Sequence, residues 1–478
     1  MREVVGLKVA VLASLDSSTA PPAGYSPLAT TSDPGTPPAK GELALPPSPT
    51  SDTKPDPPFP TPAASSRARL FRRVVFLALF LLVSTTLYLL LPADFSLRSF
   101  PSTSSPSCSA RAYSSGRWVA KDPPLSEEEK ADVLLASGFT GASQEWFKPH
   151  WFFGSKESNW HEMDDYRSRA AQWMWRSDEE VCREEVRRTD VEELVRSLVQ
   201  RGGWMLLGDS LTEQHFFSLG CTLFPHVEVK WGAGWWEQLM FLRGDSPLVP
   251  SLDLPPSFNF TGTPLITNIR TDHGFAKDEL LAIYESTPQS AVVPSSDLFT
   301  DYPVQSPPVR EYLDRFFSTG AWERSEERYH ALIFSTAAHF TPREFAFPAG
   351  QPEIKPFFEA VVANWTAEAA AYLDQDEGNR QVVVRAASSG HDKCKSSLQP
   401  FGDEWPEPQS YNWADIPRMN AAFETQYVPL AAPIRASNSD LSLPFPLFQH
   451  AADCLHMAVG TGVFEGWTDY LAYYFGGL

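Results

Sequence analysis

The strongest candidate for a catalytic residue in this chain is a serine in a short polar motif. Ser210 follows Gly208-Asp209 and the apolar run 204–207, and apolar residues with helical spacing begin at Leu211. This pattern predicts a buried strand, a tight turn and a helix. A hydroxyl at such a turn lies beside free backbone N–H groups and the positive end of the helix dipole. The position suits a nucleophile whose attack creates an oxyanion.

The tripeptide alone does not identify a catalytic serine. A second copy, Gly244-Asp245-Ser246, is followed at once by Pro247, and no helical pattern begins there. It is therefore the strand, turn and helix pattern that distinguishes Ser210 from Ser246.

A carboxylate and an imidazole near the C-terminus could complete a catalytic triad. Asp453 and His456 are three residues apart, so one helical turn would place both side chains on the same face. A carboxylate in that position can fix the tautomer of an imidazole that accepts a serine proton. The pair by itself is also typical of a protein surface. His450 with Asp453 and His456 would suit zinc, but no nearby residue has a spacing that would orient such ligands, and we expect no metal.

The two ends of the chain together carry a resemblance. Between Trp173 and Phe475 the sequence resembles the SGNH/GDSL hydrolase superfamily, and more closely its PC-esterase branch of trichome-birefringence-like polysaccharide O-acetyltransferases and their fungal relatives. Two departures are Ser335, where the family has asparagine, and Val459-Gly460-Thr461, where it has Leu-Pro-Gly. The similar segments, in order, are Leu206 to Gln214, Ala331 to Phe340, Val382 to Ala386 with Gly390-His391 and Cys394, and Asp453 to His456.

The resemblance implies roles for individual residues. Ser210 would be the nucleophile, His456 the base and Asp453 the carboxylate that orients it. The active-site block would also include Asp209 and three further positions, of which Arg270 and Gly274 follow a predicted strand where the superfamily has a second oxyanion donor. His339 follows another predicted strand and would emerge at the carboxyl edge of the sheet, near the serine. The substitution at Ser335 leaves the rest of the oxyanion hole open.

The resemblance also implies a substrate class. The expected reaction is transfer of acetyl groups to hydroxyls of a polysaccharide or glycan through an acetyl-serine, with no bound cofactor and an acetyl donor such as acetyl-CoA as co-substrate. Trp231, Trp235 and Trp236 could stack against a sugar, although tryptophan is more often a core residue. Two alternatives remain open: an esterase that removes acetyl groups with the same triad, and a non-catalytic glycan-binding module.

Length and charge exclude some classes of protein. The 478 residues suffice for one large domain or two ordinary ones, and 42% hydrophobic residues can supply a substantial core. The formal net charge of −20 would repel nucleic-acid phosphates. We therefore expect no nucleic-acid partner.

The N-terminal part predicts a membrane anchor. Residues 1–66 are rich in Pro, Ser and Thr and are expected to be a disordered cytosolic tail. Within residues 67–92, the segment 74–91 has no charged residue and follows four arginines. At 1.5 Å per residue it would span about 27 Å, which is enough for an early-secretory membrane. The arginines place the N-terminus in the cytosol, so the chain is expected to be a single-pass type II Golgi or endoplasmic-reticulum protein. The alternative is a buried core helix.

A stalk is expected next, at 93–124, with the folded lumenal domain at 125–478. Cys108 would lie in the stalk, either free or linking two copies as a dimer. The family resemblance pairs Cys394 with Cys454, and this leaves Cys182 with Cys221. Asn259 and Asn364 lie in possible N-glycosylation sequences.

Strands alternate with helices in the folded part, which predicts an α/β fold with a parallel sheet flanked by helices. The resemblance makes this an SGNH-hydrolase-like sheet. Residues 191–199 form an apolar helical stripe, and two capping boxes are expected, Ser126 with Glu129 and Thr189 with Glu192. The expected strands are 204–207, 227–231, 265–269, 332–335 and 382–386, and further helices are expected at 131–136, 309–317 and 357–373.

Overall fold

The structure is a computed structural model of the chain, which divides into two units, Met1–Arg98 and Ser99–Leu478. All of the described residues belong to the second unit. They are residues 108–131, 168–232, 236–254, 258–299, 303–318, 328–341, 344–345, 354–376, 380–390, 415–427, 434–437, 455–457 and 459–476.

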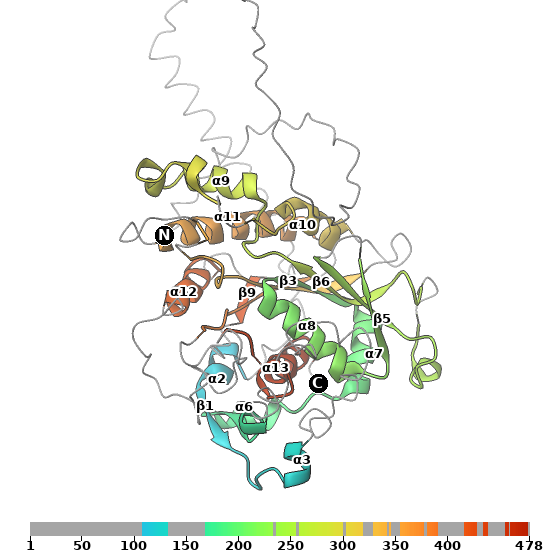
Figure 1. Cartoon of the computed structure of the whole chain (residues 1–478). Helices are drawn as coiled ribbons and strands as arrows, with labels where there is room; N and C mark the ends of the chain where they lie inside the picture. Colours follow the sequence, from blue (N-terminus) through green and yellow to red (C-terminus); the bar gives the residue numbers. More distant parts are fainter. Residues whose placement is uncertain are drawn as a thin grey trace, which may run out of the picture. The chain divides into compact units, whose positions relative to one another are not determined.

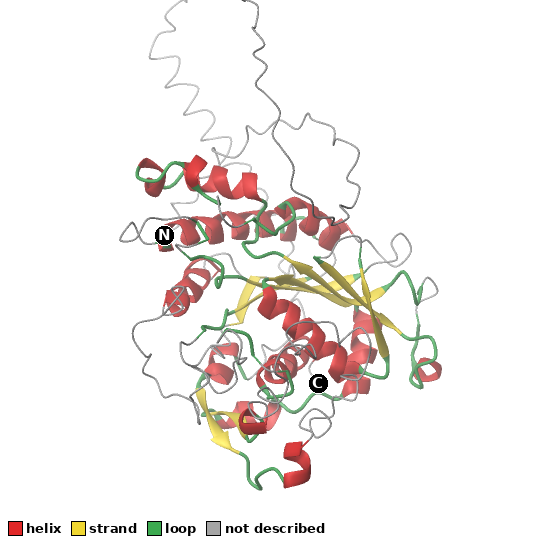
Figure 2. Cartoon of the chain, viewed as in Figure 1, coloured by secondary structure: helices red, strands yellow, loops and turns green. Residues whose placement is uncertain are grey.

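A seven-stranded sheet with helices on both faces forms the centre of the fold (Figures 1 and 2). The fold is mixed α/β, as predicted, and the sheet is mostly parallel. Its strands lie in the order β4-β5-β6-β3-β7-β8-β9, with β1 and β2 in a separate antiparallel pair. The strands are β1 (Gly116–Ala120), β2 (Trp173–Ser177), β3 (Gly203–Gly208), β4 (Val227–Trp231), β5 (Glu237–Leu242), β6 (Pro264–Arg270), β7 (Tyr329–Ser335), β8 (Gln381–Arg385) and β9 (Ile434–Ser437).

All five strands expected from the sequence are present in this sheet, as β3, β4, β6, β7 and β8. The neighbours of β3 are β6 on one side and β7 on the other, and both run parallel to it. Pairing places Gly208 opposite Arg270 and Ser335, so the segments that follow these three strands leave the sheet at one edge. Such an edge, where the chain continues to either side of a central strand, is where α/β folds bind ligands. The antiparallel strand β5 was not expected.

Two groups of helices cover the two faces of the sheet (Figure 1). One face packs against α7, α8 and α13, and the other against α9, α10, α11 and α12. The helices are α2 (Ala110–Ser114), α3 (Glu127–Ala131), α6 (Glu180–Glu185), α7 (Val191–Arg201), α8 (Ser210–Leu223), α9 (Lys277–Glu285), α10 (Val309–Ser318), α11 (Lys355–Leu373), α12 (Ile416–Tyr427) and α13 (Val463–Gly476); short 3₁₀ turns are η3 (Val249–Ser251), η4 (Pro288–Ala291) and η5 (Ser295–Asp297).

Of the two predicted capping boxes, the first is confirmed and the second is wrong. The Ser126 N–H donates to Glu129 Oε2 at 2.7 Å, and the Glu129 N–H donates back to Ser126 Oγ at 3.2 Å, which confirms the first capping box. At α7 the N-cap is Asp190, not Thr189, because Oδ1 of Asp190 accepts from the N–H groups of the next helical residues. The Thr189 hydroxyl instead donates to Asp469 in α13.

The segment expected to be a stalk is folded from Cys108 onward. The N–H of Cys108 donates to the Tyr473 hydroxyl at 3.1 Å, and the Tyr113 ring stacks on Tyr470 with a 4.8 Å centroid separation. Trp118 is buried in the same core cluster. The Ser/Pro-rich composition of 93–124 predicted an unfolded stalk, but the aromatic side chains within this segment bury apolar area against α13. The folded domain therefore begins before residue 125.

The pairing of Cys182 with Cys221, expected from the sequence, was wrong. Cys108 forms a disulfide with Cys182 in α6, and Cys221 lies buried in α8 outside this bond. Cys182 lies beside the N-terminal segment because that segment packs on α6 and α13, and this proximity decided the pairing. The Cys108 thiol is thereby used within the chain, which removes the basis for a dimer through that residue. Cys394 and Cys454 lie outside the described residues.

No helix within the described ranges is long and apolar enough to cross a membrane. The predicted anchor 74–91 and the tail 1–66 lie outside those ranges, and most of the predicted helix 131–136 does too.

The two glycosylation candidates differ in their surroundings. Asn259 lies in a turn in which Thr261 is exposed and donates to Asn259 Oδ1. Asn364 lies in α11, its side-chain amide donates to the Ala360 carbonyl, and Thr366 is buried. A glycosylation site needs an accessible loop, so only Asn259 has a suitable setting.

The disulfide yields a first prediction. Cys108→Ser should lower the free energy of unfolding by about 2–5 kcal/mol, because the bond restrains the unfolded chain across 74 residues. Thermal unfolding with and without reductant measures the effect. Reduction should bring the wild-type protein to the stability of the variant and leave the variant unchanged; an equal loss in both would contradict the bond.

Candidate functional site

Helix α8 begins at the candidate nucleophile. Asp209 is the N-cap, and its Oδ1 accepts from the Leu211 N–H at 3.0 Å. Aspartate favours this position because its side chain satisfies an N–H that has no partner inside the helix. Gly208, the last residue of β3, allows this turn because a Cβ there would lie 2.2 Å from Thr212 Oγ1. Ser210 is consequently the first residue of the helix, with 2% of its surface exposed.

The predicted base lies next to this serine. His456 Nε2 and Ser210 Oγ are 2.6 Å apart, although the two residues are 246 positions apart in the chain. Both side chains are buried, and this distance is within the hydrogen-bond reach that proton transfer requires. The structure thus brings together the serine and the histidine that the sequence predicted. Asp453, the predicted third member, lies outside the described residues, as do His450 and Trp235.

Two further side chains on α8 hold the segment that carries His456. Gln214 donates from Nε2 to the Met457 carbonyl at 2.9 Å and accepts from the Met457 N–H at 3.3 Å. One turn further on, Ser218 donates to Glu465 Oε1 at 2.7 Å. Ser210, Gln214 and Ser218 are spaced by four residues, so they lie on one face of the helix. That face fixes the C-terminal segment beside the nucleophile.

An oxyanion donor is available at the serine itself. The Ser210 N–H is one of the first helical N–H groups, which have no intrahelical acceptor, and within the described ranges it makes no hydrogen bond. The helix dipole adds positive potential at the same point. An oxygen anion formed close to Ser210 would be stabilised by both.

The second oxyanion donor expected after β6 is not formed as predicted. The Gly274 N–H donates to Thr271 Oγ1 at 2.9 Å, so it is already engaged. Gly274 has φ +81°, and a Cβ there would lie 2.9 Å from the Phe334 ring, so this glycine serves close packing instead. Arg270 donates to Asp272 Oδ1 at 3.0 Å and to Glu213 Oε2 at 3.3 Å, and in this way ties β6 to α8.

His339 belongs to a buried charged cluster at the same edge of the sheet. Its Nδ1 is 3.0 Å from Glu344 Oε1 and its Nε2 is 3.7 Å from Asp272 Oδ1. Burial opposes protonation, but these two carboxylates raise the pKa of His339 to about 9. Burial also raises the pKa of Asp209, although the nearby charge of His339 opposes this. His339 is therefore an imidazolium that joins the loops after β6 and β7.

Arg385 is a buried cation that the sequence did not single out. It ends β8, its guanidinium lies 3.9 Å from the Trp467 ring centroid, and it donates to Thr212 Oγ1 at 2.9 Å. Its Nη1 is 3.2 Å from Nδ1 of His215, a residue that turns toward α13 and not toward the serine. Burial lowers the pKa of Arg385 to about 9. Arg385 thus links the first turn of α8 to β8 and α13.

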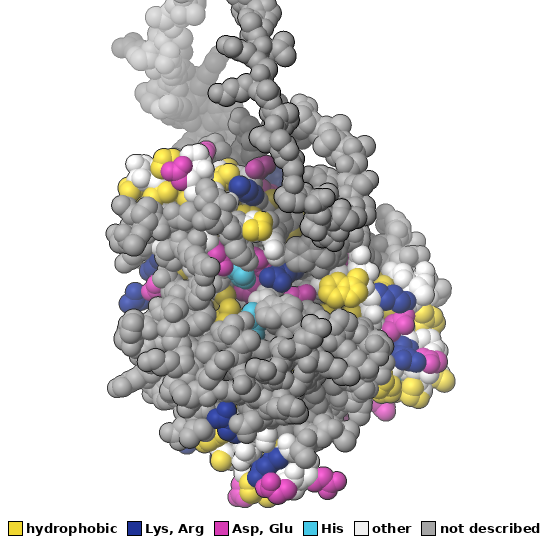
Figure 3. Space-filling model, viewed as in Figure 1, with side chains coloured by type: hydrophobic (Ala, Val, Ile, Leu, Met, Phe, Trp, Pro, Cys, Tyr) yellow, Lys and Arg dark blue, Asp and Glu magenta, His cyan; other side chains and the backbone are white. Residues whose placement is uncertain are grey.

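Two of the predicted sugar-stacking tryptophans are exposed at this edge. Trp231 and Trp236 have 51% and 40% of their surface exposed, at the tip of the hairpin between β4 and β5. The pairing of Glu237 with Ile269 places that tip beside the end of β6. One region of the surface in Figure 3 shows acidic, basic and histidine side chains next to a hydrophobic patch.

The second Gly-Asp-Ser has a different setting. Ser246 follows β5 in a turn, where its hydroxyl accepts from the Leu248 N–H at 3.3 Å and lies 2.9 Å from His226 Nδ1. Only the short 3₁₀ turn η3 follows, so no α-helix dipole faces this hydroxyl. The prediction that only the first Gly-Asp-Ser is followed by an α-helix is confirmed.

Within the described ranges, no three His, Cys, Asp or Glu side chains are grouped to hold a metal ion. Comparison with known proteins found no family model and no curated protein that matches this chain.

The glutamine contact yields a second prediction. Gln214→Met keeps the volume of the side chain but removes both bonds to Met457, so His456 should lose its alignment. We expect the rate at which a fluorophosphonate probe labels Ser210 to fall about tenfold to a hundredfold. Thr222→Val, which removes a hydroxyl bond within α8, should leave that rate unchanged. An unaltered rate in Gln214→Met would exclude the positioning role.

The charge on His339 yields a third prediction, on stability. Its folded pKa, about 9, lies above the ordinary value of 6.5, so its contribution is complete below about pH 6.5 and is lost as pH rises through 9. Chemical denaturation should show wild-type protein more stable than His339→Gln by at most about 3 kcal/mol at pH 6, with the gap closing by pH 10. His330→Gln should show the opposite trend, because burial lowers the pKa of His330 to about 4. Its unfolded imidazole takes up a proton near pH 6 that the folded one does not, so the wild-type protein should lose about 1 kcal/mol relative to this variant between pH 10 and pH 6.

Proposed function

We propose that this protein is a serine-dependent O-acetyltransferase that acetylates hydroxyls of a polysaccharide or glycan. The observation that carries the proposal is the 2.6 Å contact between Ser210 Oγ and His456 Nε2 at the N-terminus of α8. The resemblance of the sequence to the PC-esterase branch of the SGNH superfamily supports the same chemistry. A mostly parallel sheet with the serine after its central strand is compatible with that fold.

The proposed reaction has two displacements. His456 Nε2 takes the proton of Ser210 as Oγ attacks the acetyl carbonyl, and the Ser210 N–H stabilises the oxyanion. The donor's leaving group, the thiolate of acetyl-CoA or a related donor, receives that proton as the acetyl-serine forms. His456 then removes a proton from a sugar hydroxyl, which attacks the ester carbonyl, and returns that proton to Ser210 Oγ as the ester bond to the serine breaks. In this proposal Asp453 orients the His456 ring.

The acceptor is proposed from the surface beside the site. Exposed tryptophan is uncommon, and Trp231 and Trp236 would offer aromatic faces to the C–H surfaces of a sugar. The backbone N–H of Arg270 donates to the Trp236 carbonyl, so Arg270 lies next to the β4–β5 hairpin. Its side chain donates to Glu213, which places both charged groups beside the tryptophans. Segment 74–91 is proposed to anchor the domain in a Golgi or endoplasmic-reticulum membrane with the site in the lumen.

The proposal predicts that Ser210→Ala abolishes transfer. With acetyl-CoA or an activated acetyl ester and oligosaccharide acceptors, wild-type protein should form acetylated sugar, and Ser210→Ala should be slower by about a thousandfold or more. Ser246→Ala is the matched control from the second Gly-Asp-Ser and should keep the wild-type rate. Acetylated products are measured by mass spectrometry.

The same assay separates the alternatives. If acetate is released at one rate with and without an acceptor, and no acetylated sugar forms, the protein is an esterase. If Ser210→Ala retains wild-type activity, or if neither donor is consumed by any form of the protein, the serine mechanism is wrong.

A further inference from the structure

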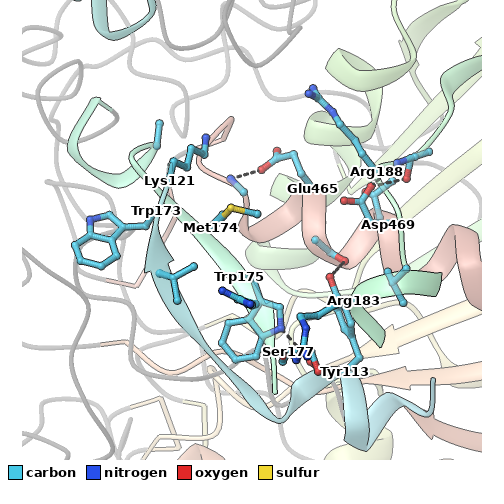
Figure 4. Close-up of a pocket in the computed structure, with 18 of the residues that line it drawn as sticks. Tyr113, Lys121, Trp173, Met174, Trp175, Ser177, Arg183, Arg188, Glu465 and Asp469 are labelled. Atoms are coloured by element: carbon cyan, nitrogen blue, oxygen red, sulfur yellow. Dashed lines mark hydrogen bonds between the residues drawn. The ribbon is translucent and has the colours of Figure 1, made fainter. Parts of the chain in front are cut away.

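A cavity of about 860 Å³ lies away from Ser210, between the antiparallel strands β1 and β2, α6, α7 and α13. Its volume is within the range of small-molecule sites. Lys121, which follows β1, enters it from one side, Arg188 and Asp469 lie on the opposite side, and Glu465 lies between them (Figure 4). The cavity thus brings charged side chains together with the aromatic residues of β2, outside the site that contains the serine.

The two carboxylates of α13 in this cavity are engaged inside the protein. Glu465 Oε1 accepts from the Ser218 hydroxyl and the Gly460 N–H, and Oε2 accepts from the Gly462 N–H at 2.6 Å. Asp469 Oδ1 accepts from both the N–H and the hydroxyl of Thr189. These groups hold α13 to its neighbours, so they have limited capacity to bind a ligand.

The ammonium group of Lys121 is different. The backbone of Lys121 is fixed by a hydrogen bond from its N–H to the Gln172 carbonyl at 2.8 Å. Its side chain is half-buried, and no hydrogen bond or ion pair to its Nζ is found in the described ranges. Burial and the charge of Arg188 lower the pKa of Lys121, and the charges of Glu129 and Glu465 offset this only in part, so the charged form is not fully compensated. An anionic group in the cavity would supply that compensation.

Cations outnumber acids along this cavity although the whole chain is strongly acidic. The acids are Glu465, Asp469 and Asp122, and the cations are Lys121, Arg176, Arg183 and Arg188. Trp173 and Trp175 also line it. The Trp175 N–H is bonded to the Tyr113 carbonyl, which fixes that ring. Fixed aromatic rings beside donors are suited to a saccharide.

We propose that this cavity binds a saccharide that carries a carboxylate, with Lys121 as the counter-charge and the β2 tryptophans as apolar walls. The site is separate from the serine and does not depend on the proposed acetyl transfer. Ser210 and Ser218 are eight residues apart on α8, so the Glu465 wall lies about 12 Å along the helix from the nucleophile.

The test measures binding to the full-length protein, with trigalacturonic acid as the probe and its methyl ester as the uncharged counterpart. Isothermal titration and tryptophan fluorescence should show the acid binding at least about tenfold more tightly than the ester. Lys121→Met keeps the apolar stem and should lose this preference, whereas Lys121→Arg should keep it. Lys130→Ala, whose ammonium is paired with Glu127 outside the cavity, is the matched control and should bind as wild type.

Each remaining outcome overturns the proposal. It is wrong if acid and ester bind equally, if the wild-type protein binds neither, or if Lys121→Met binds the acid as wild type does while its thermal unfolding is unchanged. Ser210→Ala should bind the acid normally, so that failure of the catalytic proposal leaves this one standing.

Discussion

Contact between one face of α8 and the C-terminal segment decides whether the two reacting side chains meet. Ser210, Gln214 and Ser218 reach His456, Met457 and Glu465 in the same order along the chain. A helix is rigid over this length, so the position of the serine and that of the imidazole are set by one element. The hydrogen bonds between Gln214 and the backbone of Met457 are buried, and leaving these polar groups unpaired there would be costly. The alignment of the pair therefore depends on the packing of α13 on α8.

Buried charge at the carboxyl edge of the sheet restrains the same region from the other side. Arg270, Asp272, His339 and Glu344 join the loops after β6 and β7, and Glu213 connects them to α8. Removing one member of such a cluster leaves its partner charged in a poorly solvated place, which is more costly than losing a surface pair. Arg385 extends the restraint to β8 and α13 through Thr212 and Trp467. The turn that carries Ser210 is consequently held by all the strands next to β3.

The sequence was most informative where one local pattern specifies one conformation. The apolar run before Gly208, with the turn after it, predicted a buried strand, and the helical spacing after Ser210 distinguished this serine from Ser246. The pairing of Ser210 with His456 followed from matching side-chain chemistry at the two ends. Gln214 gave no such signal. Because α8 is buried on all sides, its sequence has no alternation of polar and apolar faces from which the role of one glutamine could be predicted. Disulfide connectivity and the role of Gly274 depend on which segments pack together, and no local pattern contains that information.

The segment around Cys108 and the final helix, α13, are neighbours in space although they lie at opposite ends of the folded domain. During synthesis the N-terminal partner leaves the ribosome long before α13 exists. Trp118 can contact Trp175 once β2 has been made, but Tyr113 lacks the ring of Tyr470 until α13 has been made, and its apolar surface stays incompletely covered in the meantime. Packing of the N-terminal segment is consequently completed only after α13 has folded.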